Sequence, residues 1–286
     1  MKKPSIAIII PARYGSTRFP GKPLAPILGR AMVDHVYDIA RAARSILAQS
    51  TDFHADIDIA VTSDDDLIID HCRAQQYHVI ATPSDCATGT DRVWAAAEQL
   101  ATRPNFIINL QGDAPLTPPD FVVELIKGFS NDPQADIITP VVALTWDELD
   151  RLRAHKLTTP FSGTTAVLSP SRQAIWFSKQ ILPAMVKEKE LRAAAVTPSG
   201  LSPVYRHIGL YGYRRESLQK YITLPPSNYE KLEGLEQLRA IENNMIIQAV
   251  IVDYAGRPAM TGVDSPEDLQ RAEQLLRASR DGGDQS

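Results

Sequence analysis

Apolar runs alternate with helical repeats along the first half of the chain. The continuous apolar run at residues 6–10 is typical of a strand covered on both faces, and residues 32–46 space their apolar side chains as a helix does. The same patterns predict further strands at residues 57–61, 79–82 and 106–110, and further helices at residues 65–77, 91–101 and 118–129. Elements in this order predict an α/β fold with a doubly wound, mostly parallel, Rossmann-like sheet.

The pattern changes after about residue 135, where short strands follow one another. We expect antiparallel strands at residues 137–144, 164–168 and 174–177, a polar helical or loop excursion at 187–203, and a strand at 208–213. A helix at 229–243, a strand at 246–252 and a helix that starts at Ser265-Pro266-Glu267-Asp268 would follow. The interpretation is one domain over residues 1–286 with an inserted small antiparallel sheet, a subdomain at residues 135–213.

The bulk composition argues against several classes of protein. The chain has 286 residues, 44% hydrophobic and 22% charged, and a net charge of -4, and this acidic balance argues against broad binding of nucleic acid. Two cysteines, Cys72 and Cys86, do not make a disulfide framework and fit a reducing compartment. The apolar run that ends at Pro11 is too short for a signal peptide, and no apolar stretch could span a bilayer. We therefore expect a cytoplasmic protein without membrane insertion.

Three cations lie within ten residues directly after the first predicted strand. Arg13, Arg18 and Lys22 are unexpected neighbours in an acidic chain, and a concentrated anion such as a triphosphate would explain them. Arginine offers planar forks of N–H donors to phosphate oxygens, and lysine offers a mobile point charge. Gly15 and Gly21 would let the backbone approach such a ligand closely. The alternative is a solvated basic loop, which many proteins have.

Two aspartates stand where a metal ion could bind. Asp113 follows the apolar strand at residues 106–110, so its charge should lie at the strand tip, in water or on a cation. Asp264 follows Gly262 and comes just before a capped helix. Mg²⁺ prefers oxygen ligands and usually takes one or two protein carboxylates together with phosphate oxygens. Ordinary turn chemistry beside the glycine is the alternative for Asp264.

The basic loop resembles a family signature. Residues 11–24 read P-A-R-Y-G-S-T-R-F-P-G-K-P-L, which is similar to the nucleotide-binding loop of the sugar-acid cytidylyltransferases. It looks most like the loop of the 3-deoxy-manno-octulosonate (Kdo) cytidylyltransferases. It is not a Walker A loop, because no G-x-x-x-x-G-K-[ST] occurs. The resemblance implies a nucleotidyltransferase fold and assigns the nucleotide to Arg13, Ser16, Arg18 and Lys22.

A second motif, T-G-T-D-R at residues 88–92, resembles a loop that lies against the nucleotide in that family. Thr90 or Asp91 could cap the following helix, which would leave Arg92 free to point at the ligand. Gln111 is a plausible contact to the base or the sugar, because its amide group both donates and accepts hydrogen bonds.

Two further motifs concern the metal. Q-G-D at residues 111–113 and G-V-D-S-P-E-D-L at residues 262–269 are both signatures of the resembling family. The resemblance implies that Asp113 and Asp264 bind a catalytic Mg²⁺ ion. The chain departs from the family at Ala114, where Glu or Gln commonly follows the aspartate.

The sugar contacts are implied by two motifs in the second half. R-H-I-G-L-Y-G-Y at residues 206–213 resembles a family strand whose histidine faces the sugar acid, which implies substrate contacts for His207 and Tyr211. Without the resemblance, a lone histidine is better interpreted as a satisfied core residue. Glu233, Glu236 and Gln237 resemble part of a family helix and lie within about one turn of each other, so at least two could face one ligand. A solvated helix face is the alternative for about half of these charges.

The resemblance, from residue 6 to about residue 272, implies that CTP and Kdo react to CMP-Kdo and pyrophosphate, for lipopolysaccharide synthesis. Arg13, Arg18 and Lys22 would hold the triphosphate while the anomeric hydroxyl of the sugar attacks the α-phosphorus in line. The family's Y-F-S-R reads W-F-S-K at residues 176–179, and its V-K-V-V reads T-T-A-V at residues 164–167. Two alternatives stay open: a cytidylyltransferase for another sugar acid, such as amino-Kdo or a sialic acid, and a non-catalytic nucleotide-binding module.

The resemblance also implies a homodimer joined through the inserted sheet. Trp176, Phe177, Ile181 and Leu182 are the apolar residues that we expect to be exposed there, and a contiguous apolar surface usually marks an interface. Closed two-fold symmetry is the commonest arrangement. The alternative is that these side chains pack under residues 187–203.

Overall fold

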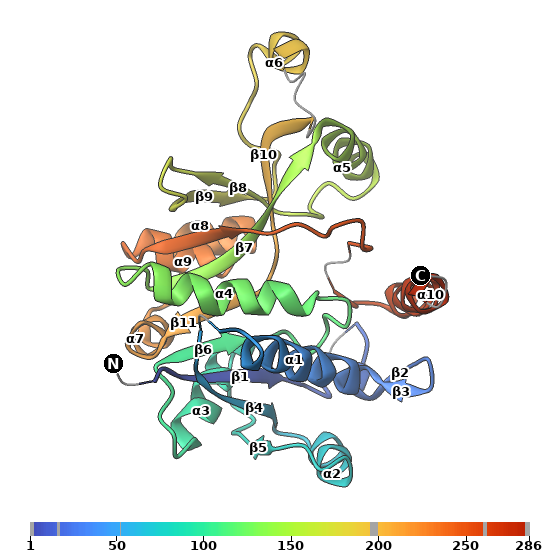
Figure 1. The fold of residues 1–286 in the computed structure, drawn as a ribbon, viewed down its shortest axis with the longest axis vertical. Coiled ribbons are helices and arrows are strands. Elements are labelled where there is room, and N and C mark those ends of the chain that lie inside the picture. The colour runs from blue at the N-terminus through green and yellow to red at the C-terminus, as the bar shows by residue number, and fades with distance from the viewer. Residues whose placement is uncertain (1–2, 16–17, 52, 195–199, 260–261, 284–286) are drawn as a thin grey trace.

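A computed structural model describes residues 3–15, 18–51, 53–194, 200–259 and 262–283. Its first half is the predicted α/β layer structure (Figure 1), because β1 (Ser5–Pro11) pairs in parallel with β4 (Asp56–Ser63) and β6 (Phe106–Asn109). Strand β5 (Val79–Ala81) extends this sheet beyond β4. The helical segments between and after these strands are η1 (Lys22–Leu24), α1 (Met32–Ala48), α2 (Asp66–Ala74), α3 (Gly89–Gln99) and α4 (Pro119–Asn131). The predicted α/β fold is confirmed.

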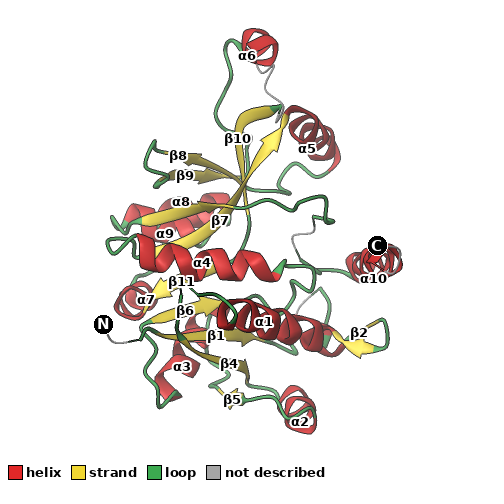
Figure 2. Ribbon diagram, in the orientation of Figure 1, coloured by secondary structure: helices red, strands yellow, loops and turns green. Residues whose placement is uncertain are grey.

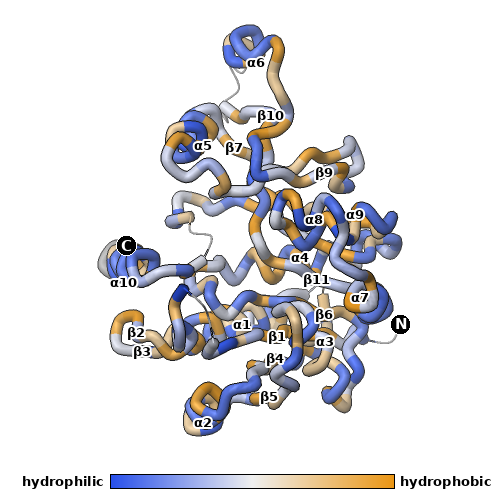
Figure 3. The backbone as a smooth tube through the Cα atoms, turned by 180° about the vertical axis from the view of Figure 1, so that it is seen from behind, coloured by the Kyte–Doolittle hydropathy of each residue, from blue (hydrophilic) through white to orange (hydrophobic). Residues whose placement is uncertain are grey.

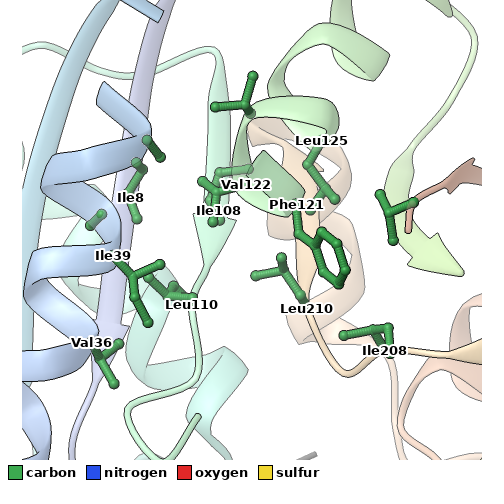
Figure 4. Packing of buried hydrophobic residues seen from close by; sticks show 14 of the residues in the cluster. Ile8, Val36, Ile39, Ile108, Leu110, Phe121, Val122, Leu125, Ile208 and Leu210 are labelled. Carbon is green, nitrogen blue, oxygen red and sulfur yellow. The ribbon is translucent and has the colours of Figure 1, made fainter. Parts of the chain in front are cut away.

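The apolar run of β1 is buried on both faces, as its composition predicts. Ile6, Ile8 and Ile10 belong to the core cluster that α1 and α4 cover, and Ala7 and Ile9 belong to the cluster on the opposite face. Figure 4 shows Ile8 among the side chains of the first cluster. Burying one such isoleucine stabilises the fold by roughly 1.5–3 kcal/mol, so this strand anchors the loop that follows it.

The antiparallel strands of the second half extend the same sheet. Strand β11 (Tyr211–Arg214) pairs antiparallel with β6 on one side and with β7 (Ile137–Thr145) on the other. Strand β10 (Leu201–His207) and then β8 (Thr165–Leu168) and β9 (Ala174–Ser178) continue beyond β7, which also pairs in parallel with β12 (Ile247–Ile251). The expected strands are therefore present, but they join the central sheet rather than form one of their own. The two-stranded sheet that stands apart is β2 (Pro26–Ile27) with β3 (Arg30–Ala31).

The helices of the second half differ most from the sequence patterns (Figure 2). They are α5 (Trp146–Thr158), α6 (Glu188–Ala194), α7 (Arg215–Thr223), α8 (Asn228–Glu233), α9 (Gln237–Glu242) and α10 (Pro266–Gly283). Neither α5 nor α7 was predicted. The single helix expected at residues 229–243 is two helices, because Gly234 ends α8 in the left-handed conformation, with φ of 63°. The strand expected at 208–213 begins only at Tyr211, because a turn separates β10 from β11.

The apolar residues expected on an exposed face are buried or half-buried instead. Phe177 is fully buried against the His207 ring, and Trp176 meets the Tyr229 ring edge-on. Ile181 packs against the core cluster, and Leu182 is half-buried. The prediction that these four form an exposed apolar surface is wrong, because Phe177 lies in the core, Tyr229 of α8 partly covers Trp176, and the other two are half-buried. Whether residues 135–213 act as a subdomain stays a prediction.

Two helices lie away from the sheet and carry mostly hydrophilic residues. Helix α6 stands apart at one end of the molecule (Figure 1), and both α6 and α10 are largely hydrophilic along the tube in Figure 3. Among the described residues, no helix combines the length and the apolar character that crossing a bilayer requires.

Candidate functional site

The site lies beyond the carboxyl ends of β1 and β6, where ligands bind in open α/β sheets. Gly112 lets the two strand ends meet, because a Cβ atom there would lie 2.4 Å from the carbonyl oxygen of Pro11. Gly21 shapes the loop after β1, with φ of 70° and an N–H that donates to the carbonyl oxygen of Tyr14 at 2.8 Å. These glycines bring the basic loop against the loop that carries Asp113.

Lys22 joins the two predicted metal-binding aspartates. Its ammonium lies 2.6 Å from Asp113 Oδ2 and 3.3 Å from Asp264 Oδ1, and it donates to the carbonyl oxygen of Val263 at 2.9 Å. The Val263 N–H donates in turn to the Asp113 carbonyl oxygen at 2.8 Å. Arg18, which is largely exposed, pairs with Asp264 at 3.2 Å. Residues 113 and 264 therefore converge on one cation, although 150 positions separate them.

The convergence fits a hard divalent cation. Two carboxylate oxygens and one carbonyl oxygen surround the point that the Lys22 ammonium occupies, and oxygen ligands of this kind suit Mg²⁺. The described residues contain no group of three or more His, Cys, Asp or Glu placed to hold a metal by themselves. A metal here would therefore need phosphate oxygens or water as further ligands.

A cavity of about 400 Å³ opens beside the basic loop. Arg13 lies in its wall and donates to the carbonyl oxygen of Cys86 at 3.4 Å. Other walls come from Lys22, from Thr88 and Gly89 at the start of α3, and from the 111–113 loop. Ser16, which was also assigned to the nucleotide, lies outside the described residues. We call this space the basic cavity.

A larger cavity of about 780 Å³ adjoins the basic cavity. The two share Gly89, Gln111, Asp113 and Glu236 in their walls, so they meet at the aspartate pair. The larger one, which we call the neutral cavity, is also lined by His207, Tyr211 and Gln237, and by Arg18 and Asp264 near the basic loop. A long ligand could therefore react across the junction.

Buried polar groups line the neutral cavity. Gln237 is almost fully buried; its Oε1 accepts from the Tyr211 hydroxyl at 3.0 Å, and its Nε2 has no hydrogen-bond partner among the described residues. Burial raises the pKa of the Tyr211 phenol, so the hydroxyl keeps its proton. Burial also raises the pKa of the Glu236 carboxyl, which accepts from the Thr90 hydroxyl at 3.2 Å. A buried donor without a partner is costly, and a ligand hydroxyl would satisfy it.

His207 is held as a neutral ring. Burial, with the nearby Lys179 charge, lowers its pKa to about 3. Its Nε2 lies 2.9 Å from the Thr139 hydroxyl, which itself donates to the carbonyl oxygen of Leu210 at 2.9 Å. Because that hydroxyl has one proton, this arrangement favours a proton on Nε2 and leaves Nδ1 as an acceptor.

Known proteins match the chain over nearly its full length. A family model described as "Cytidylyltransferase" matches residues 7–247. A 3-deoxy-manno-octulosonate cytidylyltransferase of Maricaulis maris (strain MCS10) is 40% identical over 274 residues, which cover 96% of this chain and 98% of that one. The chain belongs to the 3-deoxy-manno-octulosonate cytidylyltransferase family. A member from Anaeromyxobacter dehalogenans (strain 2CP-C) is 38% identical, with the same shares covered.

Solved structures agree with membership of the 3-deoxy-manno-octulosonate cytidylyltransferase family. A CMP:2-keto-3-deoxy-manno-octonic acid synthetase complexed with CTP matches with a TM-score of 0.77 and 31% identity, covering 96% of this chain and 99% of that chain. A cytidylyltransferase from Leptospira borgpetersenii serovar Hardjo-bovis (strain JB197) has a TM-score of 0.54 at 13% identity and shares the fold alone. The family resemblance drawn from the motifs is confirmed.

Two residues assigned to the substrate point elsewhere. Arg92 is only 1% exposed and is not among the described residues that line the two cavities. Its guanidinium donates to the Thr82 hydroxyl at 2.9 Å and pairs with Asp64 at 3.1 Å, so it ties α3 to the ends of β4 and β5. The prediction that it faces the ligand is wrong, because Thr88 and Asp91 form the capping box and turn the arginine into the core.

Glu233 is the second correction. Its carboxylate accepts from the Ser178 hydroxyl and from the Lys179 N–H, both at 2.8 Å, and it is not among the described cavity-lining residues. Gly234 ends the helix directly after it, so the next residues, Glu236 and Gln237, turn into the cavity instead. Two of the three residues, Glu236 and Gln237, thus line one cavity, and their contact with a ligand stays a prediction.

Sequence patterns missed one cation in the neutral cavity. Lys179 follows β9, lies in the cavity wall and forms no ion pair with a described carboxylate. Burial lowers the pKa of its ammonium, and the Glu233 charge opposes that shift. The signal was present, because this lysine stands where Y-F-S-R of the 3-deoxy-manno-octulosonate cytidylyltransferases has its arginine. Nothing in the sequence marked Phe161 and Ser162, which line the same cavity.

Proposed function

We propose that this protein transfers the cytidylyl group of CTP to Kdo and releases CMP-Kdo and pyrophosphate, for lipopolysaccharide synthesis. The observation that carries the proposal is the meeting of two cavities at the Asp113–Asp264 pair. One cavity is basic and follows the nucleotide-binding loop. The other has the hydrogen-bonding groups of His207, Tyr211 and Gln237 and the ammonium-bearing Lys179 in its wall, beside Glu236 and the charged residues at the junction, and these groups suit a polyhydroxy acid. Family membership adds the reaction that the relatives' names describe.

The basic cavity binds the nucleotide. Arg13, Arg18 and Lys22 neutralise the triphosphate and the departing pyrophosphate, which transfers of this kind require more than covalent chemistry. Asp113 and Asp264 would hold Mg²⁺, which supplies charge neutralisation at the phosphates when bound. For this to happen, the Lys22 ammonium moves from the carboxylates to a phosphate oxygen. Its side chain, 13% exposed, already lies at the border of the cavity.

The neutral cavity orients the sugar acid. Gln237 Nε2 donates to a sugar hydroxyl, and His207 Nδ1 accepts from another. The Lys179 ammonium attracts the sugar carboxylate, since no described carboxylate forms an ion pair with it. The anomeric oxygen then forms its bond to the α-phosphorus as the bond to pyrophosphate breaks, and the hydroxyl proton passes to solvent. The side chains act by positioning.

We also propose that the protein is a homodimer in the cytoplasm. Among the described residues, large apolar side chains that are strongly exposed to solvent include those of Leu157 at 86%, Phe161 at 70% and Val186 at 98%. Ion pairs of Arg153 with Glu188 at 2.7 Å hold α5 beside the segment that contains Val186. Light scattering should give a dimer mass, and Val186→Glu should shift it toward the monomer. A wild-type monomer would exclude the dimer.

Pyrophosphate release tests the function. Purified protein with Mg²⁺ should release pyrophosphate fastest with CTP and Kdo, compared with UTP, ATP, GTP, amino-Kdo and sialic acid. The assay includes the other sugar acids because position 179, which lines the neutral cavity, has lysine where the family has arginine. A faster reaction with another acid would change the substrate and keep the reaction class. If no acid gives pyrophosphate release, the remaining alternative is a non-catalytic nucleotide-binding module.

A further inference from the structure

Lys156 binds a cluster of backbone oxygens rather than a carboxylate. It lies near the end of α5, and its ammonium donates to the carbonyl oxygens of Ser162, Lys179 and Gly163 at 2.5, 2.6 and 2.9 Å. A fourth carbonyl oxygen, of Pro160, lies at 3.4 Å. An ammonium has three protons, so the three short contacts use its full capacity as a donor.

These carbonyl groups belong to two separate walls of the neutral cavity. One wall is the loop after α5, where Phe161, Ser162, Gly163 and Thr164 line the cavity. The other is the residue directly after β9, Lys179, which also lines the cavity. Because Lys156 binds the backbone of both, one side chain ties the loop to the residue that carries the Lys179 ammonium, in addition to the pairing of β8 with β9.

The backbone of Lys179 is held from both sides. Its carbonyl oxygen accepts from Lys156 and its N–H donates to Glu233 Oε2 at 2.8 Å. Glu233 also accepts from Ser178, so a carboxylate and an ammonium clamp the end of β9. Lys156 itself is not among the residues that line the cavity. Burial lowers the pKa of its ammonium, and the nearby charges of Lys179 and Arg206 lower it further.

We propose that Lys156 is a positioning residue for recognition of the sugar acid: it holds the 160–163 loop and Lys179 at the spacing that binds the acid's carboxylate and hydroxyls. The proposal rests on the assignment of the neutral cavity to the sugar acid. It gives Lys156 no contact with the substrate and no part in nucleotide binding, since the basic cavity lies on the far side of the aspartate pair.

Steady-state kinetics test this role with Lys156→Met, Lys156→Arg and the control Lys187→Met. Lys187 is an exposed lysine whose ion pair with Glu190 is 3.6 Å long. In Lys156→Met, the KM for the sugar acid should rise about tenfold or more, the effect expected when buried carbonyl oxygens lose their donor. The KM for CTP should stay within about twofold of wild type, as it should in the control. Lys156→Arg keeps N–H donors and should recover most of the loss.

Each other outcome overturns one specific statement. An unchanged KM for the sugar acid would reject the positioning role, and equal rises in both KM values would show that Lys156 acts only on overall folding. If Lys156→Met does not fold, CTP binding and melting of Lys156→Arg replace it, and equal losses for both substrates in that variant reject the proposal. Lys179→Met separates this from the assignment of the cavity: if it too leaves the KM for the sugar acid unchanged, the sugar acid binds elsewhere.

Discussion

The basic and neutral cavities are built in opposite ways. Walls of the basic cavity are short runs of sequence at strand ends, near residues 11–15, 22–23, 87–89 and 111–113. Beyond the strand-end loops that it shares with the basic cavity, the neutral cavity takes its walls from the loop after α5, the residue after β9, the β10–β11 turn and the α8–α9 junction. The basic one depends on local loops with glycines and charges. The neutral one depends on buried polar side chains that long-range packing brings together.

This difference separates a site that a motif can describe from one that it cannot. Arg13, Arg18 and Lys22 indicate an anionic ligand from sequence alone, because three cations within ten residues are unexpected in an acidic chain. His207, Tyr211 and Gln237 are residue types with ordinary roles in protein cores, so without the family resemblance only their position around one cavity marks them as candidate substrate contacts. Substitutions can test whether the two cavities are as independent as this contrast suggests.

The largest effect is expected at the junction. Asp113→Asn and Asp264→Asn each remove one of the negative charges that converge on a single cation, and each should lower kcat by a factor of about 100 or more, as for loss of a transition-state stabilising group. Binding of Mn²⁺ in the presence of CTP, measured by electron paramagnetic resonance, should weaken in parallel. Asp56→Asn, at the surface pair with Lys3, should do neither. Full activity in excess chelator would remove the metal from the proposal.

Lys22 should give the next largest effect, confined to the basic cavity. Lys22→Ala loses a charge-assisted contact. The transition-state stabilisation calculated from kcat/KM for CTP should therefore fall by roughly 1.5–3 kcal/mol. The same change removes the ammonium that occupies the carboxylate pair, so Mn²⁺ without nucleotide should bind more tightly than to wild type. Lys3→Ala, an exposed lysine, is the control. An unchanged kcat/KM would leave Lys22 as a loop residue that only pairs with aspartate.

Gln237 should give a smaller effect, confined to the neutral cavity. Gln237→Leu removes the acceptor for Tyr211 and the donor that has no partner among the described residues. Binding of the sugar acid should weaken by about 1 kcal/mol, so its KM should rise roughly fivefold. The KM for CTP should not change. Gln248→Leu serves as the control, because Gln248 bonds to the Ser171 carbonyl group far from the site. A rise in the KM for CTP instead would show that the two cavities do not bind their substrates independently.

The smallest effect is one of pH on stability. The unfolded His207 ring takes a proton near pH 6.5, whereas the folded ring resists protonation down to about pH 3. The folded state therefore loses stability as the pH falls through this window. His207→Gln should flatten the decline of the melting temperature between about pH 6.5 and about pH 3. His54→Gln, a change at an exposed histidine, should not. A decline of equal steepness in all three proteins would mean that His207 already titrates in the folded state.

The sequence by itself determined the layered α/β half and the chemistry of the basic cavity. Buried strands such as 6–10 and helices such as 32–46 follow from apolar periodicity, which local burial enforces. The capping box at Ser265 and Asp268 was readable for the same reason, since its partners are three residues apart. The loop cations, glycines and aspartates fall at strand ends, where a charge cannot be buried and must meet solvent or a ligand.

Only the tertiary structure decided which polar side chains reach the ligand space. Arg92 and Glu233 look like substrate contacts in their motifs, yet packing turns each toward partners that are distant in sequence. Lys156 carries no signal at all, because its partners are backbone oxygens up to 23 residues away. Side-chain direction in the interior depends on the whole set of neighbours, and a linear pattern does not contain them.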